Sequence, residues 1–138
     1  MDALSDADLI GAWSLVSSIN YRNDVGTPSF GEPPRGQIQY TADHRMSAFL
    51  MNPAWAAAGD PAAEGFDDFF AYAGSWRLAG DKVEHELDFC SSPMRIGSRF
   101  TRTVTVIDAN TIELTTAPET SRSGAVYVTK LIWRRTAA

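Results

Sequence analysis

The β-hairpin predicted around Gly80-Asp81 constrains the fold of this chain more than any other stretch. After the turn, Lys82–Phe89 alternates charged side chains with apolar or aromatic ones, a pattern typical of a strand with one buried face. A two-residue turn pairs this strand with Ala71–Leu78 and places Trp76 opposite His85. A slip of one residue would bury the charged side chains, so the pattern determines the register. The side chains expected to face inward are Tyr72, Trp76, Val83, His85, Leu87 and Phe89.

Short polar turns divide most of the remaining chain into further strands. With the hairpin they make eight: 13–21, 36–41, 45–51, 71–78, 82–89, 98–107, 111–117 and 126–135. We expect a short helix at Ser5–Ile10, a long irregular loop at Asn23–Arg35, and a helical lid that starts at Asp60-Pro61 and buries Phe66, Phe69 and Phe70. Even spacing of this kind favours an all-β sandwich or barrel.

Alternation within the other strands predicts which side chains point inward. In strand 13–21 the expected inner face is aromatic and apolar, and it includes Trp13, Leu15, Ser17, Ile19 and Tyr21. A three-residue turn at Asp108–Asn110 pairs Val106 with Ile112, Val104 with Leu114 and Arg102 with Thr116. The inner face of that strand is then Phe100, Arg102, Val104 and Val106. The turn at Asp43-His44 fits two or three residues, which leaves the orientation of Tyr40 open.

Composition excludes several classes of protein. The 138 residues carry a formal net charge of −5 and no basic stripe, so we expect one domain (1–138) and no nucleic-acid partner. The single cysteine, Cys90, allows no intrachain disulfide, and we expect it to be half-buried at a strand end. We predict no metal site and no cofactor. The N-terminus lacks a signal-peptide pattern and no apolar run could span a bilayer, so we expect a cytoplasmic monomer or homodimer.

Several short motifs, in order along the chain, resemble those of a known family. They are Leu9-x-Gly11-x-Trp13, Gly36-x-Ile38-x-Tyr40-Thr41-x-Asp43 followed by Met46-Ser47-Ala48, Ala71-Tyr72-Ala73-Gly74 with Trp76, Gly97-Ser98 with Arg102, and Leu131-x-Trp133-x-Arg135. Together they are similar to the small stand-alone lipocalin-like domains of bacteria and fungi, which are calycin barrels. His44 departs from the pattern, because the family usually has glycine after the turn aspartate.

The resemblance implies an eight-stranded antiparallel up-and-down barrel with a short N-terminal helix. One end would be closed by Trp13, with Arg135 stacked on its ring. The other end would open to a ligand and be partly covered by a short helical lid within Met51–Phe70, between the third and fourth strands. A barrel of this size holds either its own side chains or one small ligand.

His85 is the first candidate for chemistry, because it is the polar residue on an otherwise apolar face. A buried neutral imidazole has a depressed pKa and could act as a base, but it could equally be a core histidine satisfied by a neighbouring hydroxyl. Arg102 could hold a carboxylate, phenolate or enolate. Tyr40 could donate to the same oxygen. Alternatively, Arg102 could pair with a carboxylate of the protein or lie at the rim of the barrel in contact with water. The side chains expected to bind the ligand itself are Tyr72, Trp76, Phe89, Phe100 and Met46.

Three functions remain open at this level. The first is binding of a small hydrophobic molecule, aromatic or isoprenoid/polyketide-like, in the lumen of the barrel. The second is a cofactor-free lyase, cyclase or isomerase, with His85 moving a proton and Arg102 or a tyrosine stabilising the oxyanion. The third is a structural barrel whose lumen is filled by its own side chains.

Overall fold

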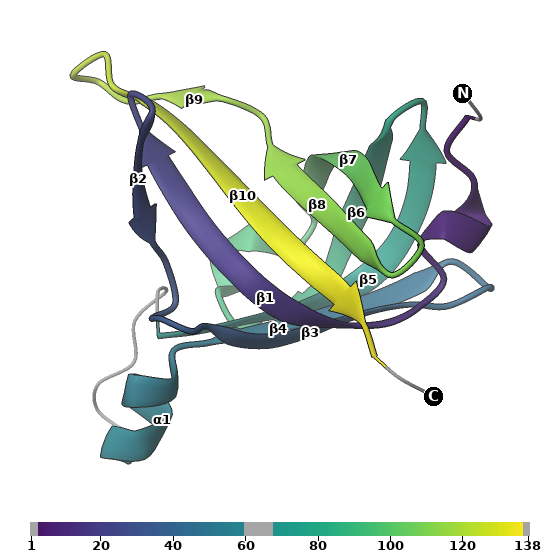
Figure 1. Cartoon of the computed structure of the whole chain (residues 1–138), viewed down its shortest axis with the longest axis horizontal. Helices are drawn as coiled ribbons and strands as arrows, with labels where there is room; N and C mark the ends of the chain where they lie inside the picture. The colour runs from purple at the N-terminus through teal and green to yellow at the C-terminus, as the bar shows by residue number, and fades with distance from the viewer. Residues whose placement is uncertain (1–2, 60–67, 137–138) are drawn as a thin grey trace.

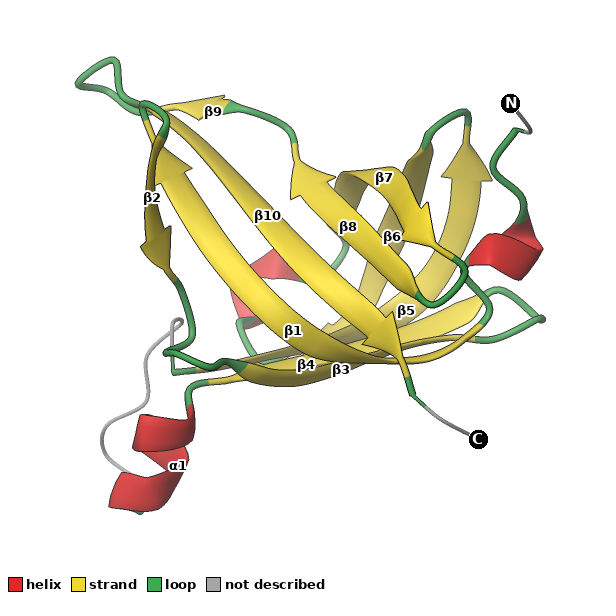
Figure 2. Cartoon of the chain, in the orientation of Figure 1, coloured by secondary structure: helices red, strands yellow, loops and turns green. Residues whose placement is uncertain are grey.

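A computed structural model describes residues 3–59 and 68–136 of the chain. Within them it contains ten strands, one α-helix and two 3-10 helices. The strands are β1 (Gly11–Arg22), β2 (Val25–Pro28), β3 (Arg35–Tyr40), β4 (Arg45–Met51), β5 (Phe69–Ala79), β6 (Lys82–Cys90), β7 (Arg99–Asp108), β8 (Thr111–Thr116), β9 (Glu119–Thr120) and β10 (Val126–Arg135). The helices are η1 (Asp6–Asp8), α1 (Pro53–Ala58) and η2 (Pro93–Arg95). The predicted all-β class is confirmed, as Figure 2 shows.

Eight strands close into the predicted antiparallel barrel (Figure 1). Their order is β1-β3-β4-β5-β6-β7-β8-β10, and β10 pairs back with β1. The short strands β2 and β9 extend the edges of β1 and β10 beyond the barrel wall. The prediction of an irregular loop at Asn23–Arg35 is therefore wrong in part. Asn23 and Asp24 both adopt positive φ, which folds β2 back on β1 as a two-residue hairpin.

The β5–β6 hairpin has the predicted register from its turn as far as Gly74 paired with Leu87. A β-bulge between Ala73 and Gly74 then shifts the pairing, so that Ala73 meets Phe89. The close approach requires glycine, because a Cβ on Gly74 would lie 1.7 Å from the Glu86 carbonyl oxygen. Beyond the bulge the predicted orientation is wrong, because Phe89 faces outward and is 65% exposed.

A second bulge changes the inner face of β1. The register against β10 shifts between Leu15 and Ser17. Trp13 and Leu15 point inward as predicted, but after the bulge Ser18 is the buried residue. Ser18 and Asn20 therefore face the lumen, and the predicted inward orientation of Ser17, Ile19 and Tyr21 is wrong.

The β3–β4 turn is the three-residue alternative. Tyr40 pairs with Met46, and the Thr41 amide donates to the Arg45 carbonyl across the turn at 2.9 Å. Tyr40 is thereby directed into the core, where it is 1% exposed. His44 occupies the left-handed position of this turn with φ +64°, which is the conformation that favours glycine. The residue that departs from the family pattern therefore adopts the left-handed conformation itself.

The β7–β8 hairpin confirms the three predicted pairs, including Arg102 with Thr116. Val104 is buried as expected. Val106 is 47% exposed, so its predicted place on the inner face is wrong. It lies next to the bulge that precedes the turn, at the end of the strand.

Of the two helices predicted outside the barrel, the structure confirms the first and places the second differently. The N-terminal helix is confirmed as η1, in which Asp8 accepts a hydrogen bond from the Ser5 amide at 2.8 Å. The helix predicted to start at Asp60-Pro61, with Phe66, falls outside the described residues. The helix between β4 and β5 is α1, which begins after Asn52, whose side chain accepts from the Ala54 amide. Phe69 and Phe70 belong to β5, not to a helix.

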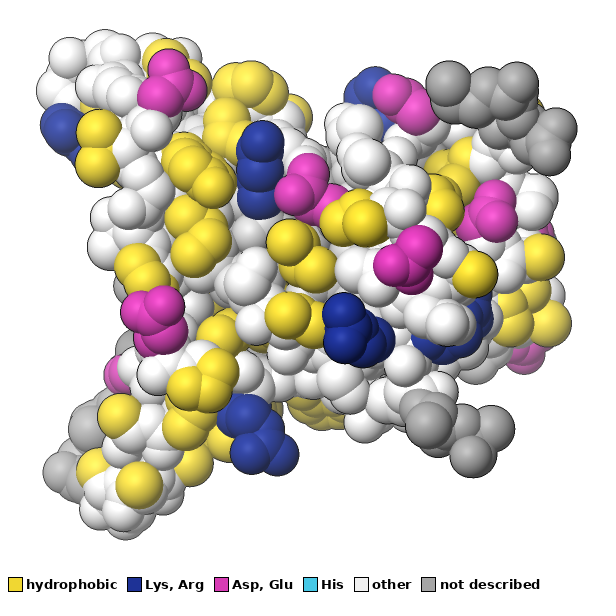
Figure 3. Space-filling model, viewed as in Figure 1, with side chains coloured by type: hydrophobic (Ala, Val, Ile, Leu, Met, Phe, Trp, Pro, Cys, Tyr) yellow, Lys and Arg dark blue, Asp and Glu magenta, His cyan; other side chains and the backbone are white. Residues whose placement is uncertain are grey.

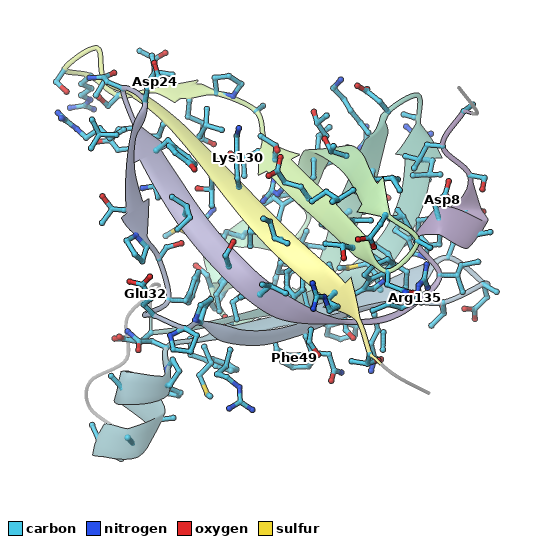
Figure 4. All side chains as sticks on the ribbon, viewed as in Figure 1. Asp8, Asp24, Glu32, Phe49, Lys130 and Arg135 are labelled. Carbon is cyan, nitrogen blue, oxygen red and sulfur yellow. The ribbon has the colours of Figure 1, made fainter. Side chains whose placement is uncertain are left out.

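One end of the barrel is closed by Trp13 and residues packed around it. The indole nitrogen of Trp13 donates to the Leu9 carbonyl at 2.8 Å. Arg135 lies over the Trp13 ring at 4.2 Å and donates to the carbonyls of Ile10 at 2.6 Å and Asp8 at 3.3 Å. Figure 4 labels Arg135 and Asp8 on the same side of the molecule. Gly11 has φ +131°, and a Cβ there would approach the Arg135 guanidinium to 2.8 Å. The stacking that the resemblance implied is confirmed.

The surface bears scattered charges. On the face seen in Figure 3, acidic and basic side chains alternate without forming a stripe of one sign. Across residues 3–59 and 68–136, no helix has the length and apolar character needed to cross a membrane.

Candidate functional site

The barrel encloses a cavity of about 610 Å³ that reaches from the centre of the fold to the end opposite Trp13. This size lies in the range of small-molecule sites, roughly 300–1,000 Å³. The side chains of residues 3–59 and 68–136 therefore leave space in the lumen. Its apolar wall comes mainly from Ile38, Leu50, Phe70, Phe100, Leu114 and Leu131.

His85 lies at the inner end of this cavity, held between two tyrosines. The ring is fully buried, and its Nε2 atom lies 2.7 Å from the Tyr40 hydroxyl. Its Nδ1 atom lies 3.1 Å from the Tyr72 hydroxyl. Tyr40 comes from β3, Tyr72 from β5 and His85 from β6; β5 and β6 are neighbours, and β4 separates β3 from β5. Both ring nitrogens of His85 are therefore satisfied by hydroxyl groups.

Burial keeps all three groups uncharged at neutral pH. Desolvation, followed by the positive charge of Arg102, lowers the pKa of the His85 imidazole to about 3. Desolvation raises the pKa of both the Tyr40 and Tyr72 hydroxyls, and Arg102 opposes this shift in each case. The predicted direction for His85 is confirmed. However, a base with a pKa of about 3 is poorly matched to proton abstraction near pH 7.

Arg102 lines the same cavity from β7. Its guanidinium lies 4.9 Å from the centre of the Phe100 ring and donates to the Thr101 carbonyl at 3.1 Å. Among the described residues no carboxylate forms an ion pair with it. The alternative in which a carboxylate of the protein neutralises Arg102 therefore finds no support in residues 3–59 and 68–136.

The predicted site residues separate into three groups. Tyr72, His85, Phe100 and Arg102 line the cavity together. Behind them, Tyr40 and Trp76 pack edge to face at 5.1 Å, and Trp76 donates to the Thr41 carbonyl. Met46 is also buried but belongs to this inner packing, whereas Phe89 lies outside the barrel.

Several lining residues escaped the sequence analysis. Ser18 and Asn20 enter the lumen only because of the bulge in β1, which alternation does not reveal. Ser18 contacts the Ser29 hydroxyl at 2.6 Å, from the loop after β2. Phe70 was placed in a helix, although the uninterrupted apolar run from Phe69 to Tyr72 would also have fitted the start of a strand.

Outside the lumen, the described structure has fewer features that could bind a ligand or a metal ion. A depression of about 220 Å³ outside the barrel is bordered by Glu84, Glu86 and Arg99, which pair with one another. Cys90 is half-buried at the end of β6, as predicted. The described residues contain no group of three or more His, Cys, Asp or Glu side chains that could hold a metal ion.

The chain was compared with protein families, curated proteins and solved structures. A family model described as a lipocalin-like domain matches residues 10–136. Among curated proteins, none matches the chain. Among solved structures, a redesigned β-barrel is 12% identical with a TM-score of 0.47, over 95% of this chain and 94% of that one. A de novo designed fluorescence-activating β-barrel is 17% identical with a TM-score of 0.48, over 96% of this chain and 100% of that one.

The family match spans nearly the whole chain and includes every strand of the closed barrel. It also includes Trp13 and Arg135 at the closed end and all the lining residues of the cavity. The chain belongs to the lipocalin-like domain family.

Proposed function

We propose that this protein binds one small hydrophobic molecule, aromatic or isoprenoid/polyketide-like, in the lumen of its barrel. The observation that carries the proposal is the cavity of about 610 Å³, whose lining combines aliphatic and aromatic side chains with polar and charged ones, including Tyr72 and His85 at its inner end. This combination is typical of ligand sites, because apolar contacts provide affinity and a few hydrogen bonds fix orientation.

The aromatic side chains suit a flat ligand. Tyr72 and Phe100 meet edge to face at 5.2 Å, and Phe70 lies 5.4 Å from Tyr72 and 6.3 Å from Phe100. These three rings form one side of the lumen close to His85. An aromatic or conjugated ligand would gain ring contacts there in addition to the burial of its apolar surface.

A cofactor-free lyase, cyclase or isomerase is a second candidate, favoured by one observation. The hydrogen-bonded chain Tyr40–His85–Tyr72 ends in the same cavity as Arg102. In that role His85 would accept the proton that leaves the α-carbon of a bound carbonyl compound, and Tyr72 and Arg102 would stabilise the enolate that this leaves. Turnover of a co-purifying molecule, identified by native mass spectrometry, that disappears in His85→Ala and Arg102→Ala would support catalysis.

Binding itself is tested by titration with N-phenyl-1-naphthylamine, a neutral dye whose fluorescence increases in apolar surroundings. We expect saturable binding by the wild-type protein. Leu131→Trp places a large ring in the lumen and should weaken binding at least tenfold.

Val16→Trp is the matched control, because Val16 lies on the outer face of β1 and is 45% exposed. It should leave dye binding unchanged. Equal affinity in the two tryptophan variants would place the dye outside the lumen and contradict the proposal.

A further inference from the structure

We propose that the lumen recognises an organic anion, in which a carboxylate, enolate or phenolate oxygen is bound jointly by the Tyr72 hydroxyl and the Arg102 guanidinium. This inference rests on the proposed binding function and specifies the chemistry of the ligand. It is drawn from the hydrogen-bond pattern around His85, the contacts of Arg102 and the charge of the cavity lining.

The first step concerns the proton on Tyr40. Its hydroxyl is fully buried, and among the described residues its hydrogen-bond partner is the Nε2 atom of His85. A buried hydroxyl proton without an acceptor is unfavourable, so Tyr40 donates to Nε2. Neutral imidazole carries a single proton, which therefore resides on Nδ1.

The second step transfers this assignment to Tyr72. The protonated Nδ1 of His85 donates to the Tyr72 oxygen, 3.1 Å away. The Tyr72 hydroxyl therefore accepts this hydrogen bond and does not donate its own proton to His85. Because Tyr72 lines the cavity, that proton is available to an acceptor in the lumen. The chain Tyr40–His85–Tyr72 thus presents one oriented O–H donor to the ligand.

The third step concerns Arg102. A guanidinium has five N–H donors, and the described contacts of Arg102 comprise one hydrogen bond, to the Thr101 carbonyl, and the Phe100 ring. Tyr72 and Arg102 flank the same Phe100 ring, at 5.2 Å and 4.9 Å from its centre. Two donors beside one ring, one of them cationic, are complementary to an anionic oxygen attached to a flat apolar group.

The charge of the lining supports the same ligand class. The chain carries a net charge of −5, yet the charged side chains along the cavity are Arg95, Arg99 and Arg102 against Glu119. Arg99 pairs with Glu84 and Glu86, and Arg95 lies over the Phe70 ring at 5.8 Å, whereas Arg102 is the arginine that shares the Phe100 ring with Tyr72. Arg102 is accordingly the cation assigned to the ligand, and the positive lining would raise the local concentration of an anion within an otherwise acidic protein.

The test uses 2-naphthoate and its methyl ester, a matched anionic and neutral pair, in competition with N-phenyl-1-naphthylamine. Both should displace the dye from the wild-type protein. Arg102→Met should weaken naphthoate binding at least tenfold, because a charge-assisted hydrogen bond is lost, and change ester binding less than threefold. Tyr72→Phe should weaken naphthoate binding in the same selective way. Arg134→Met, at an exposed position of β10, is the control and should change neither.

The outcomes separate this inference from the function on which it rests. If the ester and dye bind but Arg102→Met leaves naphthoate binding unaltered, the anion site is refuted and the binding function stands. If neither the dye nor either probe binds the wild-type protein, both proposals fail. Retained ester binding in each variant shows that the variant is folded.

A measurement on the wild-type protein alone provides a second test. A bound nitrophenol should ionise more readily than the free compound, so the visible absorbance of its phenolate should appear at lower pH when protein is added. An unchanged or increased pKa of the bound phenol would overturn the assignment.

Discussion

Arg135 and Arg102 each lie over an aromatic ring, and they differ in how many of their N–H donors form hydrogen bonds within the protein. At the closed end, Arg135 stacks on Trp13 and donates to the carbonyls of Ile10, Asp8 and Ala109. In the lumen, Arg102 lies over Phe100 and has one described hydrogen bond, to Thr101. An aromatic partner therefore does not distinguish a structural arginine from a ligand-binding one. The number of N–H donors without a partner in the protein does distinguish them, because only those donors can bind a ligand.

The largest expected contrast is between the two rings under these arginines. Trp13→Ala should lower the free energy of unfolding by about 3–5 kcal/mol, because it opens a cavity in a fully buried, closely packed region. Phe100→Ala should lower it by only about 1–2 kcal/mol, because Phe100 already borders a cavity and has less surrounding contact to lose. Urea denaturation measures both values. Equal losses would show that the lumen is as tightly packed as the closed end.

The arginines themselves provide the next contrast. Arg135→Met should destabilise the protein by about 2–3 kcal/mol, because the Ile10 and Asp8 carbonyls lose a charged donor. Arg102→Met should change the free energy of unfolding by less than about 1 kcal/mol, since it removes one hydrogen bond to a backbone carbonyl. The same denaturation experiment measures both. A greater loss at Arg102 than at Arg135 would assign Arg102 a structural role.

The smallest of the three effects depends on pH and comes from His85. Its imidazole has a pKa of about 3 in the folded protein and an ordinary value of 6.5 in the unfolded chain. Between these two values the unfolded chain binds a proton that the folded protein does not bind. This contribution to stability is complete above pH 6.5 and is lost as the pH falls toward 3. Between pH 7 and pH 5 the loss should be about 2 kcal/mol.

His85→Gln removes this titration, so the variant should show a shallower decline of unfolding free energy with falling pH than the wild type. Val16→Gln is the matched control, because it adds the same glutamine side chain at a position on the outer face of β1 that is 45% exposed, without removing a titratable group. It should retain the wild-type slope. Identical slopes in wild type and His85→Gln would mean that His85 is not buried as a neutral ring.

Much of the candidate site was predictable, and the residues show why. The strict alternation of Lys82–Leu87 and the Gly80-Asp81 turn placed Trp76 opposite His85, as the structure has it. The same reasoning placed Arg102 and Phe100 on one inner face. Alternation works in these strands because a pleated strand with one buried face permits only one register.

Prediction failed where the pleat is interrupted. The bulge opposite Gly74 turned Phe89 outward, and the bulge in β1 brought Ser18 and Asn20 into the lumen. Each bulge adds one residue to one strand, which reverses every orientation beyond it. Apart from Gly74, the residues around the two bulges give no local signal that predicts them. Gly74 indicates a bulge only once the Glu86 carbonyl is known to lie against it.

The sequence by itself determined the all-β class, the main hairpin register and the burial of His85, because these follow from periodicity and turn chemistry within short segments. The barrel family was indicated by the resemblance of its ordered motifs. Only the tertiary structure decided that the lumen is open, that Tyr40 and Tyr72 both reach His85, and that Arg102 has donors to spare. The physical reason is that hydrogen-bond partners and empty volume depend on how strands distant in the chain close around one another. Periodicity along one strand carries no information on either.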